Sequence, residues 1–220
     1  MRKIVALLLM IFPWGLRRRL LVALMGYEIH STARIGLSWI CPERLEMAAG
    51  ARIGHLTMCK GLSLLKMGEE SRLGNLNWIT GFPVGNKDFF VGEERRAELV
   101  IGEHAAVTHR HLIDCTNSVR IGRFTTFAGF RSQVLTHSID LQRCRQASRP
   151  IAIGDYCFVG TNCVLLGGSA LPDYSVLGAS SVLNKAYSDP HQLYAGNPAR
   201  PVKALSREMG YFTRSTGYVH

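Results

Sequence analysis

The sequence of 220 residues lacks the cysteine and histidine patterns of structural metal sites. None of its six cysteines forms a Cys-x-x-Cys pair, and no cysteine–histidine cluster has the spacing of zinc ligands. We therefore expect no bound metal. Cys41, Cys59, Cys157 and Cys163 have apolar neighbours, which predicts small core residues. This cysteine usage is typical of a reducing cytosol, so we expect a cytoplasmic protein.

Charged residues are also scarce, and most of them are basic. They make up 19% of the chain against 47% hydrophobic residues, which excludes a disordered chain and predicts one globular domain with at most a small appendage. The net charge of +10 predicts anionic partners, such as lipid headgroups or phosphorylated ligands. The sequence has no zinc-finger spacing, RNP-like aromatic pair or basic groove-reading helix, so we expect no nucleic-acid binding.

The N-terminus has an apolar run, Ile4 to Phe12, that is too short to cross a bilayer. It follows Arg2 and Lys3, and three arginines come after it without a small-residue cleavage site. Residues 1–27 are therefore predicted to form short basic, hydrophobic helices with Trp14 at their junction. Two roles remain open for them: contact with the anionic inner face of the plasma membrane, or packing on this domain or a partner subunit.

After Gly26, aliphatic residues recur every six positions, often with glycine beside them. Runs of this period start at Ile35, Met67, Ile101, Ile121 and Ile153, and the first run includes Cys41, Met47, Ile53 and Cys59. Neither a heptad nor a helix of about 3.6 residues per turn produces this period. A short fixed repeat predicts an all-β solenoid, in which each unit forms one strand and one tight corner around an inward aliphatic side chain. We expect the adjacent glycine to permit backbone geometry that larger residues resist.

Two breaks in the period predict loops that project from the solenoid. One covers Gly81 to Leu99, and the other covers Ser138 to Pro150, directly after His137. Loops on a rigid scaffold commonly carry functional sites. We expect these two loops to shape an acceptor pocket, with the tail, residues 206–220, capping the open end of the solenoid.

The chain resembles the hexapeptide-repeat acyltransferases in its period and in two segments, "IGDYCFVGTNCVLLGGSALPDYSVLGASSVLNK" and "LYAGNPARPVK". The resemblance covers about residues 30–205 and is greatest to O-acetyltransferases of surface-polysaccharide and lipopolysaccharide pathways. It implies a left-handed parallel β-helix over residues 28–205 and a homotrimer with sites between subunits. It also implies acetyl-CoA as donor and a sugar or lipid-linked glycan as acceptor.

The resemblance implies that Thr136-His137 carries the catalytic histidine. Imidazole suits a general base that takes the proton of an acceptor hydroxyl, because it titrates near cellular pH. Such a base needs a carboxylate that orients it. Asp140 is near in sequence, and Asp114 lies about one coil earlier, so both remain candidates.

Other polar positions are candidate ligands for the two substrates. His111 and Asn117 are candidates for binding acceptor hydroxyls, while His109 is expected to be a surface histidine. If the strand runs straight through "HRHLID", the two histidines share one face and Asp114 takes the other. The resemblance implies a path for coenzyme A along Gly160, Thr161, Ala179, Asn184, Lys185 and Arg200, where Asn184 replaces the commoner threonine.

Three alternatives remain open at this stage. A carbonic anhydrase of the same fold would bind a metal through histidines such as His104, His109, His111 and His137, but their spacing does not match. A non-catalytic β-helix scaffold would keep the repeat without needing His137. An N-acetyltransferase for an amino sugar would use the same base and donor, so the sequence does not separate it from an O-acetyltransferase.

Overall fold

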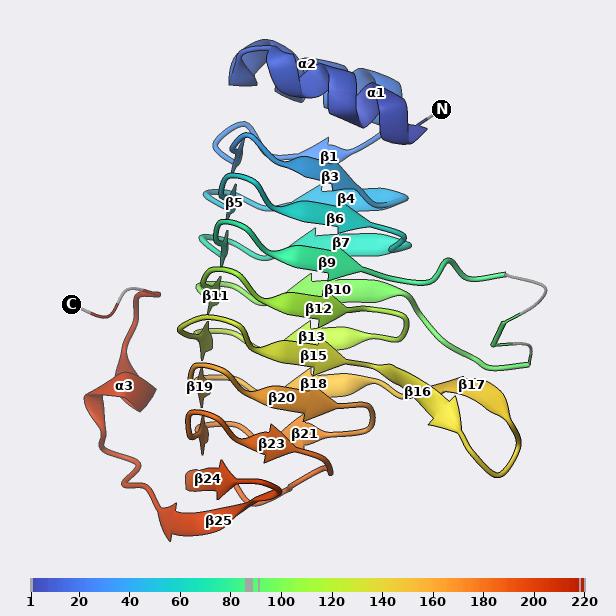
Figure 1. The fold of residues 1–220 in the computed structure, drawn as a ribbon. Helices are drawn as coiled ribbons and strands as arrows, with labels where there is room; N and C mark the ends of the chain where they lie inside the picture. Colours follow the sequence, from blue (N-terminus) through green and yellow to red (C-terminus); the bar gives the residue numbers. More distant parts are fainter. Residues whose placement is uncertain (1, 86–88, 91, 218, 220) are drawn as a thin grey trace.

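The computed structural model contains three parallel β-sheets wound around one core as a left-handed parallel β-helix (Figure 1). It describes residues 2–85, 89–90, 92–217 and 219. Each turn of the chain contributes one short strand to each sheet, and the parallel strands pair in register with those of the next turn. The fold class predicted from the six-residue period is therefore confirmed.

We call the three sheets A, B and C in the order in which the chain visits them. Sheet A consists of β1 (Glu28–Ile29), β4 (Arg44–Met47), β7 (Leu64–Met67), β10 (Glu98–Ile101), β13 (Val119–Ile121), β18 (Ile151–Ile153) and β21 (Ala170–Leu171). Sheet B consists of β2 (Arg34–Ile35), β5 (Arg52–Ile53), β8 (Arg72–Leu73), β11 (Ala106–Val107), β14 (Thr126–Phe127), β19 (Phe158–Val159), β22 (Val176–Leu177), β24 (Gln192–Gly196) and the antiparallel β25 (Ala199–Ala204). Sheet C consists of β3 (Trp39–Cys41), β6 (Met58–Lys60), β9 (Trp78–Thr80), β12 (Leu112–Asp114), β15 (Gln133–Leu135), β20 (Val164–Leu166) and β23 (Val182–Leu183).

The chain turns between sheets along three edges of the β-helix. We name them the AB edge (residues 154–157 in one turn), the BC edge (residues 160–163) and the CA edge (residues 167–169). The loop of residues 81–97 leaves at the CA edge between β9 and β10. The antiparallel hairpin of β16 (His137–Asp140) and β17 (Arg145–Ser148) leaves at the same edge between β15 and β18. Both insertions therefore project from one side of the molecule (Figure 1).

Inward aliphatic side chains stack in columns and form the core. In sheet C the column contains Cys59, Ile79, Ile113 and Leu165, all of which are fully buried. The residue of β3 in this column is Ile40 and not Cys41, because Ile40 pairs with Cys59. The strict period is wrong at this position, although Cys41 is also buried. Cys157 and Cys163 are buried too, which confirms the four cysteines as core residues.

The glycines beside the aliphatic residues are required for close approach between turns. A Cβ atom on Gly74 would lie 2.2 Å from the carbonyl oxygen of Thr108, and one on Gly102 would lie 2.7 Å from the nitrogen of Arg123. The left-handed backbone conformation occurs instead at larger residues of the edges, such as Leu76 with φ 59°. We expected these glycines to permit unusual backbone conformations. They are needed instead because the adjacent turn leaves no space for a side chain.

The N-terminal helices cover the first turn of the β-helix (Figure 1). They are α1 (Arg2–Leu8), the 3-10 helix η1 (Leu9–Ile11) and α2 (Trp14–Met25). Ala6, Leu9, Leu21 and Met25 join the core from this side. The indole of Trp14 donates to the carbonyl of Ala33. The guanidinium of Arg17 is buried and donates to the carbonyls of Gly36 and Ser38. These contacts satisfy backbone acceptors at the edge of the first coil.

The tail does not cap the end of the solenoid, contrary to expectation. The hairpin of β24 and β25 closes that end, and the tail with α3 (Gly210–Thr213) runs back beside β19 (Figure 1). The hydroxyl of Tyr211 donates to the carbonyl of Cys157, and the ring packs edge-on against Phe158. Arg214 lies over the Tyr156 ring of a stacked aromatic column at the AB edge. Aromatic rings at the edge therefore hold the tail on sheet B.

Candidate active site

His137 and Asp114 form a hydrogen-bonded pair at the CA edge. Asp114 ends β12, and His137 begins β16 at the point where the hairpin leaves β15. The Nδ1 atom of His137 lies 2.9 Å from Oδ2 of Asp114. Adjacent strands of sheet C bring the two residues together, because Asp114 pairs in register with Leu135.

The carboxylate of Asp114 is buried but accepts several hydrogen bonds. The hydroxyls of Thr116 and Thr136 each donate to it at 2.6 Å, and the backbone N–H groups of Thr116 and Thr136 donate as well. Burial by itself raises the pKa of Asp114, but the hydrogen bonds from His137, Thr116 and Thr136 outweigh it and lower the pKa to about 2. Asp114 is therefore ionised at neutral pH and fixes the proton of His137 on Nδ1.

The imidazole of His137 is held at one nitrogen and open at the other. Its side chain is 44% exposed, and the hydrogen bond that its Nδ1–H donates to Asp114 raises its pKa above the ordinary value of 6.5, against the opposing effect of burial. With the Nδ1 proton directed at Asp114, Nε2 carries the lone pair of the neutral ring. This geometry leaves Nε2 free to accept a proton from a substrate.

Asp140, the other predicted partner, does not contact His137. Its Oδ1 accepts hydrogen bonds from the backbone N–H groups of Gln142 and Arg143 in the hairpin turn. The antiparallel pairing opposes Asp140 to Arg145, at the far end of β16 from His137. The interpretation of Asp140 as the orienting carboxylate is wrong, because proximity in sequence places it along a strand and not across from the imidazole.

The side chains of His111 and Asn117 make their contacts within the β-helix. His111 is 1% exposed, its ring contacts Phe127 edge-on, and its Nδ1 accepts from the backbone of Ser132. Burial lowers the pKa of His111 to about 4, so it is neutral. Asn117 is buried and bonds Ser118 and Ser148. Neither side chain is presented to an acceptor, contrary to the sequence-based hypothesis.

The mistaken placement of His111 comes from the corner before β12. Arg110 has a positive φ of 57°, and the strand begins only at Leu112. The straight strand assumed through "HRHLID" therefore does not exist. His109 sits at the corner, where Nδ1 accepts from the backbone N–H of Asn75.

The two insertions meet beside His137. Both the N–H and the hydroxyl of Ser148 in β17 donate to Oε2 of Glu93, which belongs to the loop of residues 81–97. The Phe90 ring lies edge-on to the imidazole, with centroids 6.3 Å apart. Arg95 lies over Phe90 and donates to the carbonyl of Thr116. A wall with aromatic, basic and acidic groups thus flanks His137, and sequence reasoning had not singled out Glu93, Phe90 or Arg95.

The predicted donor residues fall into two groups on opposite edges of sheet C. Gly160, Thr161 and Ala179 lie at the BC edge, and a Cβ on Gly160 would lie 2.7 Å from the nitrogen of Ala179. Arg200 pairs with Ala195 below them. Asn184 and Lys185 follow β23 and therefore lie at the CA edge, which also carries His137. No single edge holds the whole set.

The width of sheet C separates the BC-edge group from His137. Thr161 bonds the backbone of Phe130, and from Arg131 the chain runs along β15 to His137. Six residues at about 3.3 Å each span roughly 20 Å. A thioester bound beside Thr161 is therefore too far from the imidazole of the same chain for reaction.

The four histidines considered for a metal site do not converge. His104 stacks on Phe124 at the AB edge, His109 lies at the BC edge, His111 is buried, and His137 is bonded to Asp114 at the CA edge. In the part of the chain that the structure describes, no three histidine, cysteine or acidic side chains are grouped to hold a metal ion.

The solved structures most informative for this chain are acyltransferases. The polysialic acid O-acetyltransferase OatWY matches with a TM-score of 0.58 and 16% identity, over 83% of this chain and 88% of that chain. A variant of AntD, an N-acyltransferase from Bacillus cereus solved with dTDP-4-amino-4,6-dideoxyglucose and coenzyme A, matches with a TM-score of 0.51 and 13% identity, over 75% of this chain and 82% of that chain. The chain has the fold of these acyltransferases.

A further similar structure is the hexapeptide-repeat acetyltransferase VCA0836 from Vibrio cholerae in complex with acetyl-CoA. It has 19% identity and a TM-score of 0.49 over 93% of this chain and 86% of that chain. No protein-family model matches the chain.

Proposed function

We propose that this protein is an acetyl-CoA-dependent O-acetyltransferase that modifies a sugar hydroxyl of a surface polysaccharide or lipid-linked glycan. The observation that carries the proposal is the His137–Asp114 pair, with its open Nε2, at the edge where both insertions project. The acyltransferase fold supports the same reaction class.

His137 acts as general base in the proposed reaction. Its Nε2 takes the proton of the acceptor hydroxyl while the hydroxyl oxygen attacks the thioester carbonyl. Asp114 stabilises the imidazolium that forms. The carbon–sulfur bond then breaks, the proton passes from His137 to the leaving thiolate, and the products are the acetyl ester and free coenzyme A.

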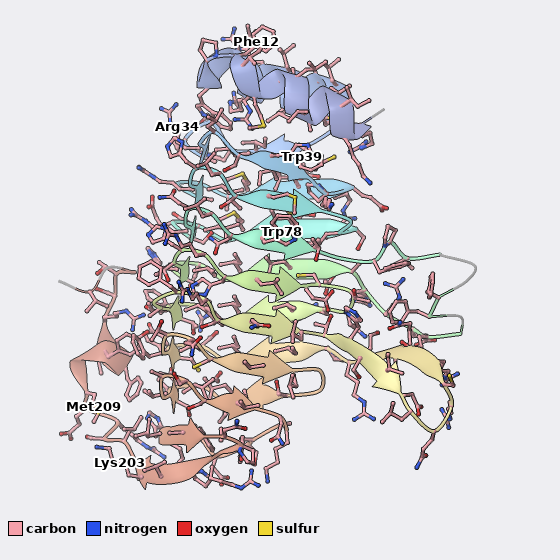
Figure 2. The ribbon with its side chains drawn as sticks, viewed as in Figure 1. Phe12, Arg34, Trp39, Trp78, Lys203 and Met209 are labelled. Carbon is pink, nitrogen blue, oxygen red and sulfur yellow. The ribbon has the colours of Figure 1, made fainter. Side chains whose placement is uncertain are left out.

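The active unit in this proposal is a homotrimer with each site shared by two subunits. The outward side chains of sheet C support self-association: they stack in register as Trp39, Met58, Trp78, Leu112, Gln133, Val164 and Val182. Trp78 is 54% exposed and Leu112 is 40% exposed, and Trp39 and Trp78 lie on the same face (Figure 2). Packing this face on a symmetric copy brings the BC edge of one subunit to the CA edge of the next.

The N-terminal helices are proposed to rest on the anionic inner face of the plasma membrane of the cell. No helix in the described ranges is long and apolar enough to cross a membrane. The helices nevertheless expose a row of large apolar side chains on the side away from the β-helix: Ile4, Leu7, Leu8, Ile11, Phe12, Leu16, Val22 and Leu24. Lys3 and Arg19 are exposed in the same segment, and residues 1–27 contain no acid. Apolar burial with basic flanks suits an anionic membrane surface.

Replacing Ile11 and Phe12 by serine is expected to reduce binding to anionic vesicles at least roughly tenfold, because each side chain loses apolar burial in the interface. Flotation with phosphatidylglycerol vesicles measures the bound fraction, and high salt should lower it. The control is Val202→Ser, which removes an exposed apolar side chain at the opposite end. Equal flotation of all three proteins, or none by the wild type, would contradict the membrane proposal.

The reaction itself is tested by acetyl transfer in vitro. Purified protein is incubated with acetyl-CoA and glycans extracted from a deletion strain, and mass spectrometry looks for glycans that gain one acetyl group. We expect the product to be labile to mild alkali, as an ester is. An alkali-stable product on an amino sugar would favour the N-acetyltransferase alternative, and the absence of any acetylated glycan would favour the scaffold.

A further inference from the structure

A cavity lies on the part of sheet B that the described residues of the tail leave open, away from His137. It has a volume of about 520 Å³ and extends from β2 to β11 and onto the BC edge. Its cationic side chains are Arg34, Arg52 and Arg72, with His55 and His109 along the other side. None of the described residues that line it is acidic. We call this cavity the basic groove.

The three arginines occupy equivalent positions on consecutive strands. Arg34 pairs in register with Arg52, and Arg52 pairs with Arg72. Strands lie about 4.8 Å apart, so three like charges stand within roughly 10 Å along the helix axis. Burial lowers the pKa of Arg72, and the charge of Arg52 lowers it further, while Glu70 opposes this. Like charges directly opposite one another on adjacent strands are destabilising.

We call this row of arginines the arginine ladder; between Arg34 and Arg52 it is an unfavourable arrangement within the described part of the chain. Arg34 and Arg52 have exposed side chains, and no carboxylate pairs with either within the described residues. An external anion with charges repeated at similar spacing would relieve the repulsion and accept charge-assisted hydrogen bonds.

The floor of the basic groove is bare backbone. Gly36, Gly54 and Gly74 lie in it on successive turns, so no side chain stands between the arginines and the two histidines there. The N-terminal helices bound the groove at one end, where Arg17 bonds the carbonyl of Gly36, and Arg34 lies close below them (Figure 2). The tail packs on the lower half of the same sheet (Figure 1). As far as the described residues show, the groove is thus a channel along the β-helix axis.

The channel leads toward the predicted donor residues. It ends at Thr108 and His109, and the next residue, Arg110, lines another cavity with Phe130 and Thr161. Both cavities follow the BC edge, which the proposed trimer brings against the His137 of a neighbouring subunit.

We infer that the basic groove binds the anionic part of the acceptor glycan, whose saccharide units carry carboxylate or phosphate groups. The inference rests on the proposed function for the identity of the ligand as acceptor. The elongated shape and the in-register spacing of the arginines select a linear chain with repeated charge over a single small anion.

Direct binding tests the groove without any transfer reaction. Binding of full-length protein is measured by calorimetry to a short oligogalacturonate, a glycerol-phosphate oligomer, a neutral maltooligosaccharide and a single-stranded oligonucleotide. We expect one or both acidic saccharide-type probes to bind in a salt-dependent way, and which of them binds identifies the carboxylate or the phosphate as the recognised group. Arg52→Gln should weaken that binding roughly tenfold or more, through loss of a charge-assisted contact.

The control variant is Arg207→Gln, which removes an exposed arginine of the tail and should leave binding unchanged. Arg52→Gln should melt at an equal or higher temperature than the wild type, because it removes repulsion within the ladder. Equal binding of the neutral probe, tighter binding of the oligonucleotide, or unchanged binding by Arg52→Gln would overturn the inference. If the groove binds an acidic probe but the protein transfers no acetyl group, the inference about the groove holds and the proposed function is wrong.

Discussion

Replacing His137 by alanine is expected to lower kcat for acetyl transfer about 100- to 10,000-fold, the usual contribution of a general base. The change removes the bond between His137 and Asp114, while the hydroxyls of Thr116 and Thr136 still donate to the buried carboxylate. The fold should therefore persist. Steady-state rates at saturating acetyl-CoA measure the effect, and far-ultraviolet circular dichroism checks the fold.

A matched control is His30→Ala, which removes an exposed histidine whose ring bonds Thr32 next to the first turn. This variant should keep the wild-type rate. Equal rates for wild type and His137→Ala on a competent acceptor would remove His137 from the mechanism.

The pH dependence separates a catalytic role from a structural one. The base must be neutral to accept a proton, so kcat/KM should fall as the pH drops through the pKa of His137. The hydrogen bond that His137 donates to Asp114 raises that pKa above 6.5, which places the acid limb of the profile above 6.5. In Asp114→Asn the carboxylate is lost, so the limb should move to lower pH and the rate should fall. An acid limb at the same pH in both proteins would contradict the pairing.

Mixing two inactive variants is expected to restore activity, because the proposed trimer forms each site from two subunits. His137→Ala removes the base at the CA edge, and Ala179→Trp fills the donor path at the BC edge, where Ala179 is exposed. Each variant alone should be nearly inactive. In randomly mixed trimers about one site in four combines an intact CA edge with an intact BC edge, so about a quarter of wild-type activity should return.

Two variants of the same edge provide the control for this experiment. His137→Ala mixed with Asp114→Asn should restore nothing, since both changes disable the CA edge. Light scattering reports the mass in solution, and Trp78→Glu should reduce it by placing a charge on the apolar face of sheet C. A monomeric wild type, or no recovery in the first mixture, would show that one chain forms the whole site.

The sequence by itself was enough for the architecture. The six-residue period specifies inward columns such as Ile53, Leu73 and Val107, and hydrophobic burial at that spacing is compatible with few folds. The breaks in the period likewise marked the loop of residues 81–97 and the hairpin after His137. The error at β3, where Ile40 and not Cys41 joins the core column, arises because both residues are apolar and buried, so the hydrophobic pattern does not distinguish them.

The site depended on contacts between turns that are distant in sequence. His137 and its loop could be recognised from the seam in the repeat, but the choice of Asp114 over Asp140 required the register of β12 with β15. The sequence suggested that His111 could bind an acceptor. The positive φ at Arg110 instead turns the chain so that the His111 ring is buried at the corner. A one-residue change of corner geometry exchanges inward and outward side chains, and the sequence carries no direct record of it.

Sequence thus determined the coil, the break in the repeat at His137 and the net positive charge. Tertiary structure alone decided which charges meet. It paired Asp114 with His137, aligned Arg34, Arg52 and Arg72 on successive strands, and separated the donor residues onto two edges of sheet C. The physical reason is that stacking of coils places residues about 20 positions apart within one strand spacing of each other, at distances where electrostatic and hydrogen-bond energies are large.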